Sequence, residues 1–90
     1  MIKIKKEEIV KKHCYTKLVY ERINKKLKTN FSTDESQILI KKILEETTLE
    51  NYIKKGKNFY ISNKQHAIRV TVNSNTFRVI TVDRITNKLR

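Results

Sequence analysis

The spacing of apolar residues changes once along this chain, near Tyr52, and that change limits the folds that the chain can adopt. Before Tyr52 the apolar residues recur three and four positions apart, which is typical of amphipathic helices. After Tyr52 they alternate with polar residues, which is typical of strands with one buried face. Helices followed by short strands predict an α+β domain, with two or three N-terminal helices packed on one face of a small C-terminal antiparallel sheet.

The chain has 90 residues, enough for one domain, and we expect that domain to span residues 1–90. The helical part should cover about 5–47, the sheet about 53–83, and a basic tail 84–90. A domain of this size buries only about 60–65 % of the surface that its unfolded chain exposes, which leaves room for one thin core. An enclosed substrate cavity or an extended cofactor-binding fold is therefore excluded.

Three helices are expected before the change. The spacing predicts one from Thr16 to Lys28, a second that ends near Glu46, and a shorter one upstream, from Glu7 to His13. The second long helix should begin at a capping box, in which Ser32 and Glu35 each accept a hydrogen bond from a backbone N–H at the helix start. Its acidic residues therefore have a structural explanation and need no catalytic one.

The sheet is predicted from the alternation and from turn residues. The only glycine, Gly56, should form a tight basic turn within Lys54–Asn58, because glycine takes positive φ without steric penalty. We expect three strands, rich in β-branched residues, with a turn between the first two. These segments are Phe59–Ile61, the turn Ser62–Lys64, about His66–Asn73 and about Thr76–Asp83.

A two-residue loop, Ser74-Asn75, should connect the last two strands and fix their register. That register places Thr71 opposite Arg78 and Arg69 opposite Ile80. One face of the sheet is then apolar and packs on the helices through Phe59, Ile61, Ile68, Val70, Val72, Phe77 and Val79. The opposite face carries Asn58, Tyr60, Arg69, Thr71, Asn73, Thr76 and Arg78, no acidic residue, and two apolar residues, Ile80 and Val82.

The formal net charge is +12, and the excess of basic residues lies in two separate parts of the chain. Residues 1–30 hold ten Lys or Arg and three Glu, and residues 53–90 hold nine Lys or Arg and one Asp, whereas residues 31–52 are acidic overall. Such a balance favours a polyanionic partner. The alternative is that the N-terminal lysines only form a solvated surface.

The polar sheet face predicts binding of nucleic acid, because arginine gives bidentate hydrogen bonds to phosphate and tyrosine gives a surface on which a base stacks. The absence of a zinc finger, basic zipper or clear helix-turn-helix pattern favours RNA over DNA. The residues expected to bind are Lys54, Lys55, Lys57, Asn58, Tyr60, Arg69, Thr71, Asn73, Thr76 and Arg78.

Four segments of the chain resemble a known family. They are His13–Leu18, Glu21–Leu27, Ile53–Tyr60 and Val72–Thr81, and they are similar to a small bacterial domain family of unknown function, the one numbered 3781. The resemblance covers about His13 to Asp83, and its most specific parts are the Lys-Gly-Lys-Asn-aromatic turn and the Asn-Ser-x-Thr hairpin. That family implies no activity. At the level of fold alone, the order of helices and strands also resembles the small ribonuclease toxins of the barnase and RelE type.

The second resemblance implies a metal-independent endoribonuclease from a toxin–antitoxin pair. Such an enzyme needs groups that move protons at the ribose 2′-oxygen and the leaving 5′-oxygen, and positive charge for the phosphorane. The candidate catalytic residues are His66, Arg78 and Tyr60, with His13 as the other histidine. A third hypothesis is an inhibitor, encoded by a phage or mobile element, that binds a nucleic-acid-processing enzyme. Binding, cleavage and inhibition stay open at this point.

The single cysteine, Cys14, cannot form an internal disulfide, and no Cys/His cluster offers metal ligands. We therefore expect no metal, no cofactor and a reducing, cytoplasmic setting. No run of eighteen apolar residues and no signal-peptide pattern is visible, so a membrane is not expected as a partner. An acidic protein, such as an antitoxin or a nuclease, is a further candidate partner, and the oligomeric state is left open.

Overall fold

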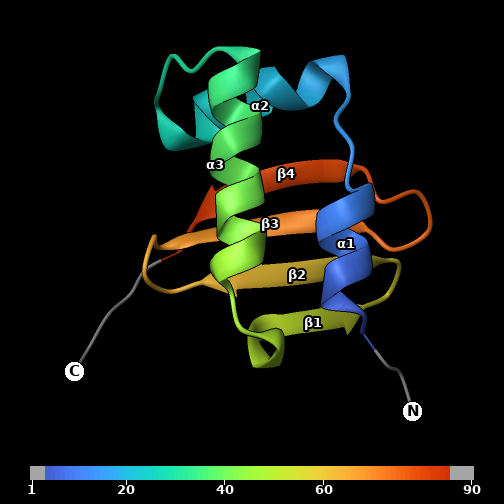
Figure 1. The fold of residues 1–90 in the computed structure, drawn as a ribbon. Coiled ribbons are helices and arrows are strands. Elements are labelled where there is room, and N and C mark those ends of the chain that lie inside the picture. Colours follow the sequence, from blue (N-terminus) through green and yellow to red (C-terminus); the bar gives the residue numbers. More distant parts are fainter. Residues whose placement is uncertain (1–3, 86–90) are drawn as a thin grey trace.

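The computed structural model describes residues 4–85 of the chain. Over these residues the chain forms three α-helices and then four strands, which confirms the predicted α+β class (Figure 1). The helices are α1 (Lys6–Lys12), α2 (Lys17–Leu27) and α3 (Thr33–Glu46), and a single 3₁₀ turn, η1 (Leu49–Asn51), follows them. The strands are β1 (Tyr52–Lys55), β2 (Asn58–Asn63), β3 (Ile68–Asn73) and β4 (Val79–Arg84).

The four described strands form one antiparallel sheet in the order β1-β2-β3-β4, so each strand pairs with the next one along the chain. Figure 1 shows α1 and α3 crossing one face of this sheet and α2 lying alongside β4. Two contacts hold α2 in place: Lys26 Nζ lies 3.1 Å from Asp83 Oδ1, and Arg84 Nη2 donates to the Leu27 carbonyl at 3.0 Å. The β4 edge is therefore covered, whereas β1 is the outer strand of the other edge.

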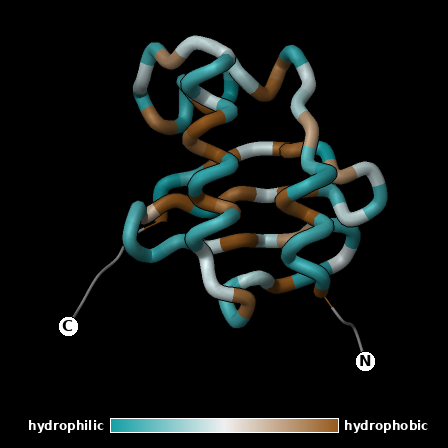
Figure 2. The backbone as a smooth tube through the Cα atoms, in the orientation of Figure 1, coloured by the Kyte–Doolittle hydropathy of each residue, from teal (hydrophilic) through white to brown (hydrophobic). Residues whose placement is uncertain are grey.

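The core lies between the sheet and the helices, where the apolar residues of both layers meet (Figure 2). Its most deeply buried members are at most 2 % exposed, and they come from every helix and from β2, β3 and β4. They are Ile9, Val19, Ile23, Leu27, Ile40, Ile43, Leu44, Ile61, Val70, Val72, Val79 and Val82. Burial on this scale is the main source of stability in a domain this small.

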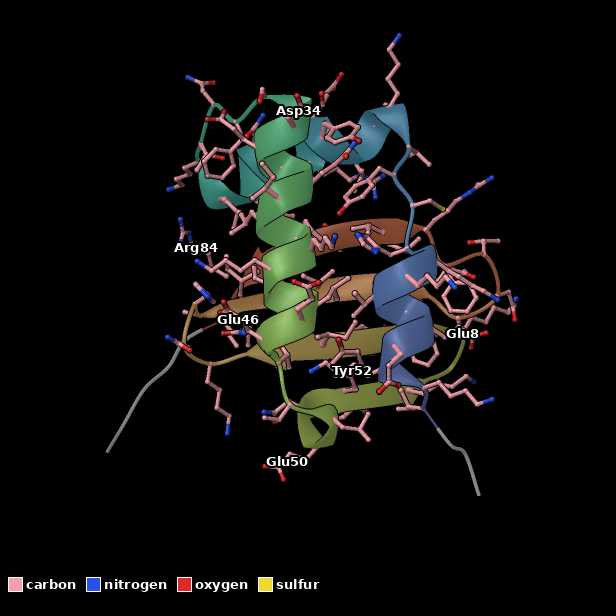
Figure 3. All side chains as sticks on the ribbon, viewed as in Figure 1. Glu8, Asp34, Glu46, Glu50, Tyr52 and Arg84 are labelled. Atoms are coloured by element: carbon pink, nitrogen blue, oxygen red, sulfur yellow. The ribbon has the colours of Figure 1, made fainter. Side chains whose placement is uncertain are left out.

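Tyr52 ties β1 to α3 inside this core. Figure 3 shows its side chain lying between the sheet and the helices, and its hydroxyl donates a hydrogen bond to the Leu44 carbonyl. Burial, and to a smaller extent the charge of Glu7, raises the pKa of Tyr52, so the hydroxyl keeps the proton that it donates.

The three predicted helices are present, with ends close to those expected. At the start of α3, the Glu35 N–H donates to Ser32 Oγ at 3.1 Å and the Ser32 N–H donates to Glu35 Oε1 at 2.8 Å, which confirms the capping box. At the end of α2, Lys28 adopts the left-handed conformation with φ of 58°. That conformation ends the helix, because it turns the chain away from the helical path.

The prediction of three strands was wrong, because Tyr52–Lys55 forms a strand of its own. The predicted turn Ser62–Lys64 was also misplaced: Ser62 and Asn63 belong to β2, and the turn covers residues 64–67. Asn63 extends the strand because its buried side chain donates to Thr47 Oγ1 at 3.0 Å. Of the predicted basic tail, Arg84 is the last residue of β4, and residues 86–90 lie outside the described residues.

The predicted two-residue loop between β3 and β4 was wrong as well. The loop runs from Ser74 to Phe77, closed by hydrogen bonds from the Asn73 N–H to the Arg78 carbonyl and from the Phe77 N–H to the Asn73 carbonyl, both 2.9 Å. Asn73 Oδ1 also accepts from the N–H groups of Asn75 at 2.7 Å and Thr76 at 2.9 Å. A short polar side chain that bonds its own backbone in this way favours a longer turn over a tight hairpin.

The longer loop changes the register. Thr71 lies opposite Thr81, not Arg78, and Arg69 lies opposite Asp83, not Ile80. A bulge between Thr71 and Val72 makes Ile80 an extra residue in β4, and an extra residue reverses the face on which later side chains lie. Val82 therefore points into the core at 0 % exposure, although it was predicted on the polar face.

Gly56 and Lys28 both have a positive φ, and substitutions at these two residues measure the cost of a left-handed backbone. Gly56 has a φ of 63°, and a Cβ added there would meet no atom within 4 Å, so Gly56→Ala changes only the backbone preference. We expect it to lower the free energy of unfolding by roughly 1–2 kcal/mol, the cost of a left-handed residue with a side chain. Lys28→Gly should raise it by roughly 0.5–1 kcal/mol for the same reason. Thermal melts followed by circular dichroism measure both, with Lys57→Ala as a control in the Gly56 turn. A Gly56→Ala variant as stable as the wild-type protein would contradict the expected cost of a left-handed alanine.

Candidate nucleic-acid interface

The sheet face that points away from α1 and α3, called here the outer face, is built from three rows of directly paired residues. Residues paired across antiparallel strands share a face, so the register assigns every member. The middle row is Ile53, Tyr60, Thr71 and Thr81; on one side of it lie Ser62, Arg69 and Asp83, and on the other Lys55, Asn58 and Asn73.

In the described part of the chain, no helix crosses the outer face (Figure 1). Its centre is closely packed by its own side chains, since Thr71 on the central strand β3 is only 5 % exposed. Tyr60 and Arg69, on either side of Thr71, are half-buried, and Ile53 on the outer strand is 57 % exposed. The face therefore offers a polar surface with an apolar border at β1.

A shallow hollow of about 610 Å³ lies on this face, and both arginine and tyrosine line it. Its lining residues are Ile53, Lys55, Gly56, Tyr60, Ser62 and Arg69, with no acidic residue among them. A phenol ring beside an aliphatic side chain suits a planar base, and the guanidinium and ammonium groups suit phosphate. The hollow therefore combines the two chemistries that a nucleotide requires.

The electrostatics of Arg69 differ from those predicted. Asp83 lies directly opposite it, so the prediction of a face without acidic residues was wrong. The Asp83 carboxylate is nevertheless occupied, because it pairs with Lys26 Nζ from α2. Arg69 Nε is buried and has no hydrogen-bond partner among the described residues. A buried N–H of a cation without an acceptor is costly, so this part of Arg69 lowers the stability of the fold.

The Gly56 turn and the loop between β3 and β4 lie at the same end of the sheet, joined by a hydrogen bond from the Ser74 N–H to the Lys57 carbonyl at 2.8 Å. Lys54 Nζ donates to the Gly56 carbonyl at 3.1 Å, which adds its charge to the turn. Asn73 and Thr76 have roles within the loop, because Asn73 Oδ1 and Thr76 Oγ1 accept its backbone N–H groups. At this end of the sheet the lysines supply the positive charge, and Asn73 and Thr76 shape the loop beside them.

The three candidate catalytic residues do not come together. Tyr60 lies on the outer face, and Arg78 lies at the end of the β3–β4 loop, where its backbone pairs with Cys14. His66 lies in the turn after β2, at the opposite end of the sheet, with Nε2 at 3.0 Å from Glu46 Oε1. Figure 3 shows Glu46 and Glu8, from α3 and α1, at these two ends. A strand of six residues separates the ends by about 20 Å.

The other histidine, His13, belongs to an aromatic cluster that was not predicted from the sequence. Its Nδ1 lies 2.7 Å from the Val10 carbonyl, which can only accept, so Nδ1 carries a proton; its Nε2 lies 2.8 Å from the Tyr15 hydroxyl oxygen. Burial, and then the charge of Tyr20, raises the pKa of Tyr15, which keeps its hydroxyl a donor. Tyr15 stacks on Tyr20 with ring centroids 5.6 Å apart. The i, i+2 spacing of His13 and Tyr15 carries no helical or strand signal, so sequence alone gave no indication of the pair.

Across residues 4–85, no three His, Cys, Asp or Glu side chains are grouped so that they could hold a metal ion. Of the helices within those residues, none has the length and apolar character to cross a membrane. The hollow on the outer face, which combines cations and an aromatic ring with no acidic residue in its described lining, is the candidate site.

The fold and the site define a class: a small α+β domain in which helices precede a four-stranded meander over the described residues, with a cationic hollow on the uncovered sheet face. A family model described as "Protein of unknown function (DUF3781)" matches residues 7–83, and the chain belongs to this family. That result confirms the first resemblance and extends it by six residues toward the N-terminus, from His13 to Glu7. Comparison with curated proteins and with solved structures gave no match, so no structural neighbour supports the likeness to barnase or RelE.

Proposed function

We propose that this protein binds single-stranded RNA through the outer face of its sheet. The observation that carries the proposal is the hollow in which Tyr60 and Arg69 lie together with Lys55 and without an acidic residue. Tyr60 offers its ring for base stacking, and Arg69 and Lys55 offer charge to the phosphates on either side of that base. The net charge of +12 supports the proposal, because it attracts a polyanion over distances longer than any contact.

The proposal favours a single strand over a duplex for a geometric reason. A shallow hollow on a sheet can take an unstacked base, whereas the major groove of an RNA duplex is too narrow and deep for side chains to enter. The half-buried Arg69 side chain on the same face brings positive charge to the hollow where that base would lie. The lysines of the Gly56 turn then extend the cationic surface along the strand.

Binding without cleavage is the form that the geometry supports best. Among residues 4–85, no histidine and no carboxylate lines the hollow, so this part of the chain does not bring to it the usual groups for moving protons at the ribose and at the leaving oxygen. His66 lies at the far end of the sheet, paired with Glu46. The ribonuclease and the inhibitor hypotheses therefore enter as outcomes of the test below, and the cytoplasmic setting expected from Cys14 remains part of the proposal.

The test is a pair of substitutions in the hollow. Tyr60→Val removes the stacking ring but suits a strand, and we expect it to weaken binding of a labelled oligouridylate about 5- to 150-fold, since base–aromatic stacking contributes about 1–3 kcal/mol per base. Arg69→Gln removes one phosphate contact, so the slope of log affinity against log salt should fall by about 0.7. Fluorescence anisotropy over a salt series measures both effects.

The matched control is Lys42→Gln on α3, which also removes one positive charge but lies on a helix that covers the opposite face. Equal affinities of Lys42→Gln and the two hollow variants would exclude the outer face as the site. Incubating the protein with the same RNA in EDTA separates binding from cleavage, because products that disappear with His66→Gln or Arg78→Gln would establish the ribonuclease hypothesis instead. Absence of any RNA binding, together with capture of an acidic protein by the same face, would favour the inhibitor hypothesis.

A further inference from the structure

A second, smaller hollow lies where α2 meets the start of β4. It has a volume of about 160 Å³, and two arginines from different elements line it, Arg22 from α2 and Arg78 from the end of the β3–β4 loop. The other lining residues are Thr16, Leu18, Val19, Val79 and Ile80, with no acidic residue among them. Ligand pockets for drug-sized molecules measure about 300–1,000 Å³, so this hollow suits a group of the size of one phosphate, not a whole nucleotide.

Hydrogen bonds place both arginines beside this hollow, through the neighbouring backbone for Arg78 and through the side chain for Arg22. Arg78 lies in a short parallel bridge with Cys14, where the Cys14 N–H donates to the Phe77 carbonyl and the Val79 N–H donates to the Cys14 carbonyl, both at 2.8 Å. Arg22 Nη1 donates to the Ile80 carbonyl at 3.4 Å. Both side chains are exposed, and among residues 4–85 neither one forms an ion pair with a carboxylate. Their charges are therefore available to an anion.

The position of this hollow relative to the outer face follows from the register. Arg22 and Lys26 are four residues apart on α2, so they lie on the same side of the helix, and Lys26 reaches Asp83 of the outer face. Ile80 directly precedes Thr81, the last member of the middle row that contains Tyr60. Two strand spacings, about 10 Å, separate Tyr60 on β2 from this part of β4. The arginines thus lie at the border of the outer face, beyond β4.

We infer that Arg22 and Arg78 together hold one phosphate of the same RNA strand whose base stacks on Tyr60, an inference that rests on the proposed function. The strand then runs across β3 and β4, from the hollow at Tyr60 and Arg69 to the border with α2. The bulge at Ile80 displaces this part of β4 from the regular pleat, and Ile80 lines the hollow together with the two arginines. Two arginines that converge on one oxyanion give a geometric specificity that scattered lysines lack.

The experiment compares Arg22→Gln, Arg78→Gln and the double variant with wild-type protein, using oligouridylates of about 3 and about 12 nucleotides, the longer one within the range that single-strand-binding domains contact. Because both arginines hold one phosphate, the double variant should lower the salt slope for the longer oligomer by about 0.7, and neither single variant should lower it by more. The shorter oligomer, bound at Tyr60, should not respond to any of these substitutions.

The control is Lys41→Gln/Lys42→Gln on α3, which removes the same two charges from the helix-covered side and should leave the salt slope within error. Thermal melts of all variants show whether the fold is retained, and Arg78 contributes to the bridge with Cys14 only through its backbone. A double variant that lowers the slope by about 1.4 would show two separate phosphates and overturn the shared site. Loss of binding on Tyr60→Val with no response to Arg22 or Arg78 would overturn this inference alone, and failure of wild-type protein to bind RNA would overturn the proposed function with it.

Discussion

Replacing Ile43 by alanine will lower the free energy of unfolding by about 2–5 kcal/mol, because the change removes buried methyl groups and leaves a cavity that the surrounding side chains fill only in part. Ile43 is 0 % exposed in the last turn of α3, which crosses the inner face of the sheet (Figure 1). Alanine is the better helix former, so a loss of stability reports packing and not helix propensity. A chain of 90 residues has a total stability of roughly 5–13 kcal/mol, so this one substitution removes a large share of it.

Ile38→Ala is the matched control, since it makes the same substitution in the same helix at a residue that is 66 % exposed. We expect it to change stability by less than about 0.5 kcal/mol. Thermal or urea unfolding followed by circular dichroism measures both, and each kcal/mol corresponds to about 4–8 °C in Tm for a domain of this size. Equal effects of the two substitutions would contradict the assignment of the inner face of α3.

Replacing Thr47 by valine will lower stability by about 1–3 kcal/mol, although valine fills nearly the same space. Thr47 and Asn63 are 2 % and 4 % exposed, and Asn63 Nδ2 donates to Thr47 Oγ1 at 3.0 Å. Valine leaves that amide without its acceptor at a position where the side chain is almost fully buried. The Ile43 carbonyl keeps a partner, because the Thr47 N–H also donates to it at 3.0 Å, so the loss is confined to Asn63.

Thr47→Ser separates the hydrogen bond from the packing. Serine keeps the hydroxyl and loses one methyl group, a change of about 0.8 kcal/mol. If the hydroxyl matters more than the methyl, Thr47→Val will be the less stable of the two variants in chemical denaturation. The reverse order would mean that Asn63 finds another acceptor and that the end of β2 does not depend on Thr47.

Much of the candidate site could be derived from the sequence, and two features could not. Alternation placed Tyr60, Arg69 and Thr71 on one face, because neighbouring side chains of a strand lie on opposite faces wherever pairing is regular. The register of Arg78 was wrong because the side chain of Asn73 lengthens the loop, and the bulge at Ile80 then reverses the faces of later residues such as Val82. Neither the loop length nor the bulge leaves a distinct pattern in a run of β-branched residues.

The separation of His66 from Arg78 does not depend on the register. In the predicted hairpin Arg78 already lay opposite Thr71, five residues along the strand from His66, so only a tertiary contact could have joined them. In the structure the β2–β3 turn and the β3–β4 loop lie at opposite ends of the sheet, as they must in a meander. Arg78 instead lies close to Arg22, fifty-six residues earlier in the chain, and α2 contributes to the surface that the sheet alone was expected to form.

The sequence by itself determined the elements and the chemistry of the surface. Periodicity gave the order of helices and strands, the Ser32 and Glu35 pair gave the start of α3, and the excess of lysine and arginine gave the class of partner that we propose. These properties are local, since they depend on residues within a few positions of one another. Only the tertiary structure decided which cations converge, because α2 covers β4 through contacts such as Lys26 with Asp83 and Arg84 with the Leu27 carbonyl, each between residues fifty-seven positions apart. Spacing along the chain contains no information about contacts of that range.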